Sequence, residues 1–208
     1  MDSSRLSTKF HNIAVEISNS EILNREPDEI DQFGKHWRLN KNEELVIDKY
    51  GTKIWYKNGK EHREDGPAVE NANGTKAWYL NGELHREDGP AIERADGLKE
   101  WYKNNQYRKD GPAIERANGT KEWILNGKPH REDGPAVELA NGIKKWYLHG
   151  KLHREDGPAI ERPGGLTSSW YLNGKRIKTK STDFNSPDFQ KRWKKLVELE
   201  RVRQVMEN

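Results

Sequence analysis

The chain has 208 residues, of which 32% are hydrophobic and 34% charged, and its net charge is +3 at neutral pH. So few apolar residues would suit a disordered chain, but the 8 Trp, 7 Tyr and 4 Phe argue against disorder, because disordered chains are poor in aromatics. Without cysteine there are no disulfides, thiolate metal sites or cysteine nucleophiles. No apolar run is long enough to cross a membrane and no apolar signal region opens the chain, so we expect a soluble cytoplasmic protein.

The first 44 residues depart from the pattern that follows, and we predict that they form an N-terminal cap. Residues 12–17 alternate partly between apolar and polar and suggest a strand. Residues 21–32 are acidic and suggest a short helix or a loop. Residues 35–40 suggest an early strand, and residues 45–48 with the following Tyr-Gly stand in for a strand and its turn.

A repeat of about 23 residues then determines the predicted architecture. Tryptophans recur at spacings of 23, 23, 22, 23 and 24 residues. They are Trp55, Trp78, Trp101, Trp123, Trp146 and Trp170. In phase with them, His-Arg-Glu-Asp-Gly-Pro-Ala starts at His62, His85, His130 and His153, and the third copy reads Tyr-Arg-Lys-Asp-Gly-Pro-Ala from Tyr107, with tyrosine in place of histidine. We predict three regions: the cap at 1–44, a repeat array at 45–180, and a C-terminal helix at 181–208.

Each repeat is predicted to contain two short strands, such as 76–80 and 91–94. The Asn-Gly and Asp-Gly pairs that follow the second strand, such as Asn73-Gly74, predict type I′ hairpins. Neighbouring side chains of a strand point to opposite faces, so the sheet should carry a Trp row on one face and a Tyr row on the other. The Tyr row is Tyr56, Tyr79, Tyr102, Tyr147 and Tyr171, with Ile124 in the fourth repeat.

These residues resemble the MORN repeat, in the form found in proteins of large phages and giant viruses. The resemblance covers about residues 45–175 and rests on an aromatic strand followed by Asn-Gly-x-x-His and a Gly-rich return. It departs from the usual MORN unit, which has His-Gly-x-Gly where this chain has His-Arg-Glu-Asp-Gly-Pro-Ala. The resemblance implies a mainly β fold: an extended single-layer antiparallel β-sheet of about six two-stranded repeats. It also implies binding or scaffolding, with proteins or acidic lipids as partners and no catalytic set.

The C-terminal residues predict one helix. Ser186, Pro187 and Asp188 supply an N-cap, a proline at the first helical position and an early acid. Phe189, Trp193, Leu196 and Val197 follow on one face, and Leu199, Val202 and Met206 form a second stripe. We expect the helix to run to about Met206 and to cap the open sheet edge, with docking or homodimerisation through it as the alternative.

The His-Arg-Glu-Asp motif could hold a metal or perform acid–base chemistry, because imidazole and carboxylate are suited to both. However, catalytic sites are rarely repeated in tandem, and only Arg, Asp, Gly, Pro and Ala are common to all five copies. We therefore interpret the motif as a structural loop, in which Asp accepts hydrogen bonds, Gly supplies a positive φ and Arg pairs with a carboxylate. We expect no catalytic residue, no metal ligand and no cofactor.

Binding remains as the predicted function. Basic and acidic residues interleave, whereas nucleic-acid binding favours a segregated basic patch, so nucleic acid is the less favoured partner. A single-layer sheet cannot cover both faces, so one aromatic row is expected to be exposed and to bind a protein, although both rows could simply build the sheet. The third and fourth repeats deviate most, at Asn105, Tyr107, Ile124 and Pro129. The predicted binding residues are Tyr79, Trp101, Tyr102, Tyr107, Arg108, Trp123, Arg131 and Tyr147.

The resulting hypothesis is a non-catalytic protein-binding module. The viral character of the repeat suggests a phage-encoded factor that acts in the host cytoplasm and inhibits or modulates a host defence protein. Two alternatives remain: a protein that binds or sequesters a nucleotide or nucleic acid, and a structural scaffold or membrane-associated MORN-type protein.

Overall fold

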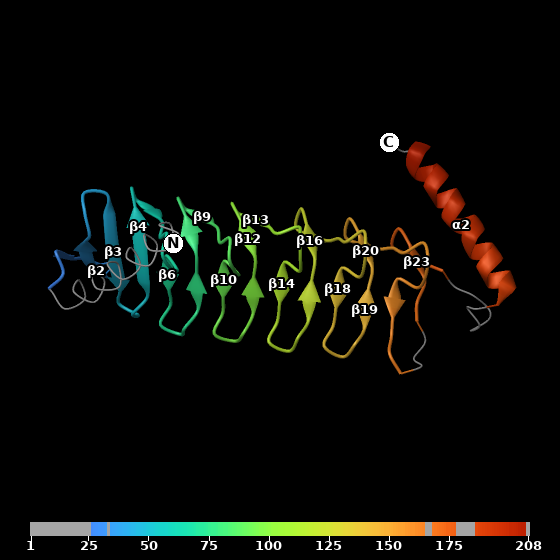
Figure 1. Cartoon of the computed structure of the whole chain (residues 1–208), viewed down its shortest axis with the longest axis horizontal. Helices are drawn as coiled ribbons and strands as arrows, with labels where there is room; N and C mark the ends of the chain where they lie inside the picture. Colours follow the sequence, from blue (N-terminus) through green and yellow to red (C-terminus); the bar gives the residue numbers. More distant parts are fainter. Residues whose placement is uncertain (1–25, 33, 165–167, 178–185, 207–208) are drawn as a thin grey trace, which may run out of the picture. The chain divides into compact units, whose positions relative to one another are not determined.

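The computed structural model describes residues 26–32, 34–164, 168–177 and 186–206. This part of the chain is mainly β, with fourteen strands in an open antiparallel sheet of regularly spaced hairpins and one C-terminal helix (Figure 1). The fold class predicted from the repeat is thereby confirmed. The chain divides into two compact units, residues 1–107 and 108–208, which are described separately. The strands predicted at residues 12–17 lie outside the described residues, and in 26–32 a strand stands where a helix or loop was predicted.

In the first unit the sheet order is β1-β2-β3-β4-β6-β7-β10-β11, with β5 paired to β4. The bounds are β1 Glu29–Ile30, β2 Gly34–Arg38, β3 Glu43–Asp48, β4 Lys53–Lys57, β5 Lys60–Glu61, β6 Val69–Glu70, β7 Lys76–Ala77, β10 Ile92–Glu93 and β11 Lys99–Glu100. In the second unit the order is β14-β15-β18-β19-β22. Those bounds are β14 Ile114–Glu115, β15 Lys121–Glu122, β18 Val137–Glu138, β19 Lys144–Lys145 and β22 Ile160–Glu161.

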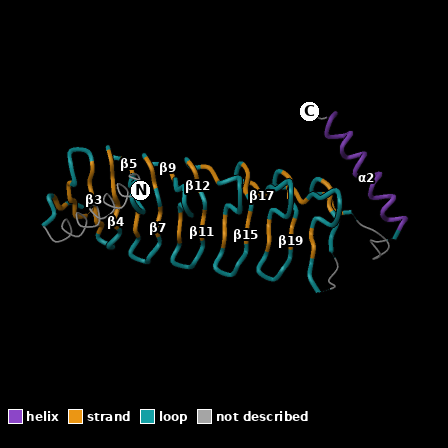
Figure 2. Tube along the Cα trace, viewed as in Figure 1, coloured by secondary structure: helices purple, strands orange, loops and turns teal. Residues whose placement is uncertain are grey.

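A second set of small hairpins follows the tryptophans. Their bounds are β8 Tyr79–Leu80 with β9 Glu83–Leu84, β12 Tyr102–Lys103 with β13 Gln106–Tyr107, β16 Ile124–Leu125 with β17 Lys128–Pro129, β20 Tyr147–Leu148 with β21 Lys151–Leu152, and β23 Tyr171–Leu172 with β24 Lys175–Arg176. The predicted strand 76–80 is therefore interrupted at Trp78. The Trp78 N–H still bonds the carbonyl of Ala91 (2.8 Å), but its carbonyl accepts the N–H of His85 (3.0 Å). The chain thus leaves the sheet at Trp78, Trp101, Trp123 and Trp146, whereas β4 continues through Trp55; Figure 2 shows the alternation of strand and loop.

The two kinds of Asn-Gly pair form different turns. Asn81 and Gly82, between β8 and β9, both have positive φ (55° and 83°), as a type I′ turn requires. Asn73 does not: only Gly74 has a positive φ, and its N–H bonds the carbonyl of Asn71 (2.9 Å). The turns between sheet strands are thus three-residue loops with glycine in the left-handed region, so the hairpin prediction was right and its turn type was wrong.

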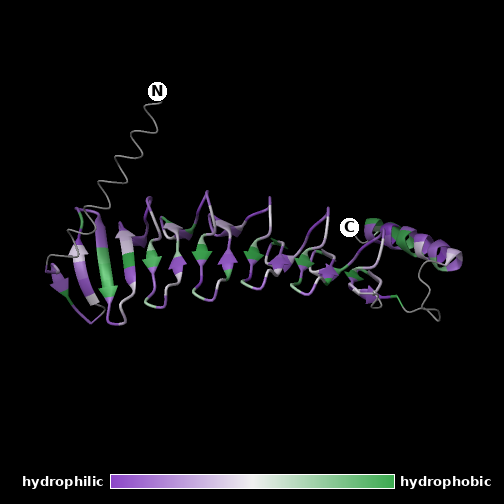
Figure 3. Cartoon of the chain, turned by 60° about the horizontal axis from the view of Figure 1, so that its bottom comes forward, coloured by the Kyte–Doolittle hydropathy of each residue, from purple (hydrophilic) through white to green (hydrophobic). Residues whose placement is uncertain are grey.

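A ladder of alternating charges crosses one row of the sheet in each unit. Glu93 on β10 lies opposite Lys76 on one side and Lys99 on the other, and Glu138 on β18 lies opposite Lys121 and Lys144 in the same way. Opposite charges on facing strands stabilise a sheet by about 0.2–1 kcal/mol per pair. The ladder therefore contributes to strand pairing. In the adjacent row Val or Ile stands on every second strand, as Ile92 does between Ala77 and Glu100, and Figure 3 shows hydrophobic and hydrophilic strands alternating.

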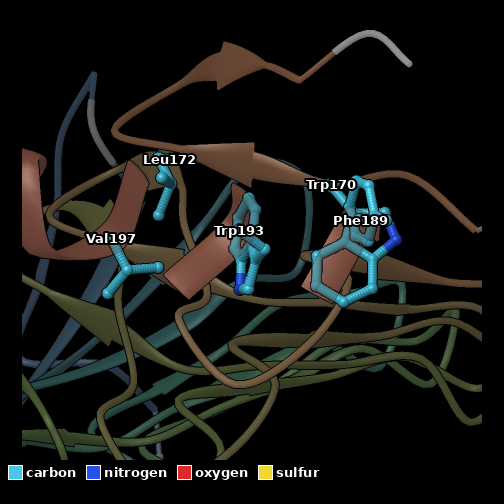
Figure 4. Packing of buried hydrophobic residues seen from close by; sticks show 5 residues of the cluster. All are labelled: Trp170, Leu172, Phe189, Trp193 and Val197. Atoms are coloured by element: carbon cyan, nitrogen blue, oxygen red, sulfur yellow. The ribbon is translucent and has the colours of Figure 1, made fainter. Parts of the chain in front are cut away.

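The cores are small and lie near the ends of the described chain. In the first unit Trp37, Leu45 and Trp55 are direct neighbours across β2, β3 and β4, and all are buried. In the second unit helix α2 (Pro187–Met206) packs Phe189, Trp193 and Val197 on Trp170 and Leu172 of the last repeat (Figure 4). The helix begins as predicted, because the Ser186 hydroxyl accepts the N–H of Phe189 (3.3 Å).

Polar contacts fix the helix on the repeat. The indole N–H of Trp193 donates to the carbonyl of Glu155 (2.7 Å), and Arg201 forms an ion pair with the carboxylate of Glu155. The amide of Asn173 donates to Glu200 (2.7 Å). Capping of the last repeat by the helix is therefore present within this unit. In the described part of the chain no helix has the length and apolar character needed to span a bilayer.

Candidate functional site

In four of the five motifs the arginine lies over the ring of the tryptophan of its own repeat. The guanidinium carbon is 4.0–4.2 Å from the ring centroid, the range of a cation–π contact. The pairs are Arg63 on Trp55, Arg86 on Trp78, Arg131 on Trp123 and Arg154 on Trp146. The repeat tryptophans and tyrosines are all buried or half-buried. The predicted exposed aromatic row is therefore wrong: arginine covers the Trp row.

The same guanidinium is held by the rest of its motif. In the second repeat Arg86 Nε donates to Asp88 (2.8 Å), and Nη1 donates to the carbonyl of Pro90 (3.3 Å) and to Glu93 (3.0 Å). Arg63, Arg131 and Arg154 repeat the bond to aspartate at 2.7–2.9 Å. Because the arginine is positioned by bonds to its own loop, it contributes to the repeat itself. The interpretation of the motif as a structural loop is supported.

The role predicted for the motif glycine is wrong. Gly66, Gly89, Gly111, Gly134 and Gly157 do not have positive φ. Instead, a Cβ added at Gly89 would stand 2.9 Å from the guanidinium carbon of Arg86, closer than real Cβ contacts. Glycine is required here because the guanidinium lies between the indole ring and the glycine Cα. The alanine that follows the Gly-Pro pair is fully buried in all five copies of the motif.

The motif histidines connect one repeat to the next. His62, His130 and His153 each accept, at Nδ1, a backbone N–H from the turn of the following repeat at 3.0–3.1 Å. The neutral ring then carries its proton on Nε2, which faces the glutamate two residues on, as in His62–Glu64 (3.3 Å). The imidazole is thus bonded on both sides. No group of three or more His, Asp or Glu side chains within the described ranges is placed to hold a metal ion.

Acid should weaken this connection. Burial lowers the pKa of His153 below its ordinary 6.5, more than Glu155 and Glu200 raise it. The unfolded chain therefore takes up a proton first, and the free energy of unfolding should fall as pH drops below about 6.5 towards the folded pKa. Urea unfolding at pH 7.5, 6.5 and 5.5 measures this. A His153→Gln variant should show a smaller pH dependence than the wild type; equal slopes would contradict the prediction.

The third repeat lacks the histidine altogether. Tyr107 pairs with Tyr102 across its small hairpin as Leu84 pairs with Tyr79, so Tyr107 is the counterpart of Leu84. The repeat is one residue shorter, which explains the Trp spacing of 22, and the prediction that Tyr107 replaces histidine is wrong. The ring of Tyr107 stacks on Tyr102 (centroids 4.4 Å apart), and both hydroxyls donate to buried Glu100.

This tyrosine pair belongs to its own repeat. Burial raises the pKa of Tyr102, and the hydrogen bond with Tyr107 and the charge of Glu100 raise it further. The phenol of Tyr102 is therefore a neutral donor at physiological pH, and both hydroxyls are occupied by Glu100. Of the other predicted residues in this unit, Tyr79 accepts the N–H of Arg63 at its carbonyl (3.1 Å), and Trp101 is half-buried. The four do not form a common site.

In the second unit three predicted residues line one groove of about 350 Å³. Its walls are the loops 108–110 and 130–133, and its floor is the segment 123–125. Arg108, Trp123 and Arg131 are thus brought together, whereas Tyr147 is outside the groove and only accepts the N–H of Arg131 at its carbonyl (3.2 Å). We take this groove as the candidate functional site.

Arg108 is held differently from the other motif arginines. Its Nε donates to the carbonyl of Pro112 (2.6 Å) rather than to an aspartate, and its Nη2 lies 3.9 Å from Glu115. Burial lowers its pKa, which Asp110 and Glu115 partly offset. In this shortened loop the arginine Nε therefore bonds a proline carbonyl, whereas in the regular repeats it bonds an aspartate.

Lys109 and Leu125 are among the groove residues that the sequence prediction did not include. Lys109 stands where the second repeat has Glu87, and Leu125 stands where the third repeat has Lys103. Glu87 and Lys103 form an ion pair (2.7 Å), but their counterparts are an ammonium and an apolar side chain. Among the described residues no carboxylate pairs with Lys109. The motif itself carried the signal for Lys109, because the third copy reads Arg-Lys-Asp where the other copies read Arg-Glu-Asp.

Comparison with known proteins does not assign the chain to a family. No family model matches the chain, and no curated protein is similar enough to count as a match. What is established is a β-repeat protein built from an antiparallel sheet of regular hairpins.

Proposed function

We propose that the chain is a non-catalytic repeat protein that binds another protein, with the groove of the second unit as its recognition site. The observation that carries the proposal is this groove, which has an apolar floor between two charged loops. A pocket of this kind can receive an anchor side chain of a protein partner, as the pockets at interaction hot spots do. Trp and Arg, which line it, are also common at interaction hot spots.

The bonding of the repeats supports binding over catalysis. The motif arginines are held by aspartate, glutamate and a carbonyl of their own loops, as Arg86 is. The histidines that accept a backbone N–H at Nδ1 have that lone pair occupied, as His130 does. A general base needs that lone pair, and a phosphate-binding arginine needs unoccupied donors. Protein recognition needs neither.

The resemblance to MORN repeats extends the proposal. We place the chain with the MORN-like proteins of the phage and giant-virus type, and we propose that it acts in the cytoplasm of a host cell, where it inhibits or modulates a defence protein. The support is the Trp-Tyr-x-Asn-Gly-x-x-His-Arg-Glu-Asp-Gly-Pro-Ala pattern of the sequence. A scaffold or membrane-associated role and the sequestration of nucleotide or nucleic acid are the alternatives to be separated by experiment.

Affinity capture tests the proposal. The full chain, immobilised through a tag, is incubated with a lysate of the native host, with and without nuclease. We expect one protein to elute at a stoichiometric ratio, unaffected by nuclease and by added anionic lipid vesicles. Elution of nucleic acid without a protein partner, seen as a raised ratio of absorbance at 260 and 280 nm, would contradict it.

A further inference from the structure

We propose that the groove of the second unit recognises a peptide segment in which an acidic residue adjoins an aromatic one. This inference rests on the proposed function and names the chemistry of the partner. It comes from what the third and fourth repeats have exchanged relative to their neighbours. The partner's carboxylate would pair with Lys109, and its aromatic ring would lie on Ile124 and Leu125.

Three Lys and Arg cations line the groove, and one of them, Arg108, lies 3.9 Å from the carboxylate of Glu115. Arg131 is bonded to Asp133 (2.8 Å) and lies on Trp123, so its charge is already compensated. Lys109 is exposed, and among the described residues it has no carboxylate partner; Leu125, which lines the groove beside it, is uncharged like its counterparts in the second, fifth and sixth repeats. A carboxylate from a ligand would form an ion pair with Lys109. This pair would correspond to the Glu87–Lys103 pair one repeat earlier, except that Lys109 supplies the positive charge at the position where Glu87 supplies the negative one.

The shape of the groove favours an aromatic neighbour for that carboxylate. Five repeats have tyrosine at the position of Ile124, so the fourth repeat lacks a ring and a hydroxyl there. Ile124 and Leu125 are half-buried, and with Trp123 they make an apolar floor in a groove of about 350 Å³. A planar ring from the partner would occupy the space that tyrosine takes in the other repeats and bury apolar area there.

The remaining charges argue against a polyanion. Asp110, Glu132 and Asp133 line the same groove, and the side chain of Glu132 is 84% exposed. Three cations and three carboxylates line the groove, so it carries no net positive charge to attract a triphosphate or a nucleic-acid strand. One carboxylate can approach Lys109 without meeting all three. The groove therefore favours a peptide with one acid over a nucleotide.

Titration of the full-length ¹⁵N-labelled protein with two defined probes tests this inference. The probes are N-acetyl-aspartyl-phenylalanine amide and N-acetyl-lysyl-phenylalanine amide. We expect the aspartyl probe to shift the amide resonances of Lys109, Leu125 and Glu132, and to bind at least about threefold more tightly than the lysyl probe, the scale of one exposed ion pair. Lys109→Glu should reverse this preference.

Lys128→Glu is the matched control, because it makes the same charge change on an exposed lysine of the same repeat that is not part of the groove. It should leave the preference unchanged. Ile124→Tyr restores the residue of the other repeats and should weaken both probes by about fivefold or more, while the far-ultraviolet circular dichroism spectrum stays that of the wild type.

Three results would overturn the inference: no shift at these amides, equal behaviour of Lys109→Glu and Lys128→Glu, or tighter binding of ATP than of the aspartyl probe. The proposed function fails separately. A captured protein partner that binds wild type, Lys109→Glu and Ile124→Tyr alike would remove the groove from recognition and leave protein binding in place. Loss of that partner on both groove variants, but not on Lys128→Glu, would support both.

Discussion

Trp193→Ala is expected to weaken the packing of helix α2 on the last repeat by about 3–5 kcal/mol, the usual cost of removing a buried aromatic ring. Trp193 is 3% exposed, its ring lies edge-on to Trp170 (4.7 Å between centroids), and its N–H donates to Glu155. The substitution removes all three contributions at once. Amide hydrogen exchange of residues 187–206 measures the effect, and we expect protection of the helix to be lost.

Leu199→Ala is the control for this experiment. Leu199 lies on the same helix but is 56% exposed, so its truncation should change protection by no more than about 0.5 kcal/mol. If Trp193→Ala and Leu199→Ala reduced protection equally, the helix would not be held by the cluster around Trp170. The comparison thus separates packing on the repeat from the helix's own propensity.

Gly89→Ala is expected to destabilise the protein by about 1–3 kcal/mol, but only while Arg86 is present. The new methyl group would meet the guanidinium carbon at 2.9 Å and force it off the ring of Trp78. In an Arg86→Ala background the space is empty, and alanine should be neutral or slightly stabilising, because it restricts the unfolded chain. Urea unfolding of the wild type, both single variants and the double variant measures this coupling.

Gly74→Ala serves as the comparison, since Gly74 has a φ of 89°, a conformation that is strained for alanine whatever its surroundings. Its cost should be the same with and without Arg86. A Gly89→Ala cost that persisted in the Arg86→Ala background would mean that glycine is needed for its backbone, as the sequence alone suggested. The two variants therefore distinguish a glycine required because a Cβ would clash with a side chain from a glycine required because of its positive φ.

Local sequence predicted the hairpins and the helix because their signals are contained in a few adjacent residues. Ser186-Pro187-Asp188 predicted the start of α2, and the period of the tryptophans predicted the repeat. The interruption at Trp78 was not predictable in this way, because an aromatic strand residue looks the same whether its carbonyl stays in the sheet or turns to His85. The turn-type prediction was wrong for a similar reason. Asn-Gly suits both the two-residue type I′ turn and the three-residue loop, and strand pairing determines which one forms.

The candidate site was predicted in part. Arg108, Trp123 and Arg131 were identified from their residue types and from the irregularity of the third and fourth repeats, and they line the groove. Lys109 was missed because only its place in the groove, beside residues 123–125 of the next repeat, gives the Lys-for-Glu exchange a possible role. The strand register resolves the alignment, since Tyr107 pairs with Tyr102. Strand pairing therefore shows the one-residue deletion directly, whereas matching the motif letters of the repeats does not.

The charge ladder has a consequence for how such a chain can change in length. Lys76 lies between Glu70 and Glu93, and Glu138 lies between Lys121 and Lys144. Each of these charged residues therefore faces an opposite charge on both neighbouring strands. A copy of a whole unit, spliced in beside the original, would bring one lysine and one glutamate and would leave no charge unmatched. Duplication and loss of entire units by recombination would therefore meet little electrostatic resistance, while an insertion of one residue within a strand would place its charges on the opposite face.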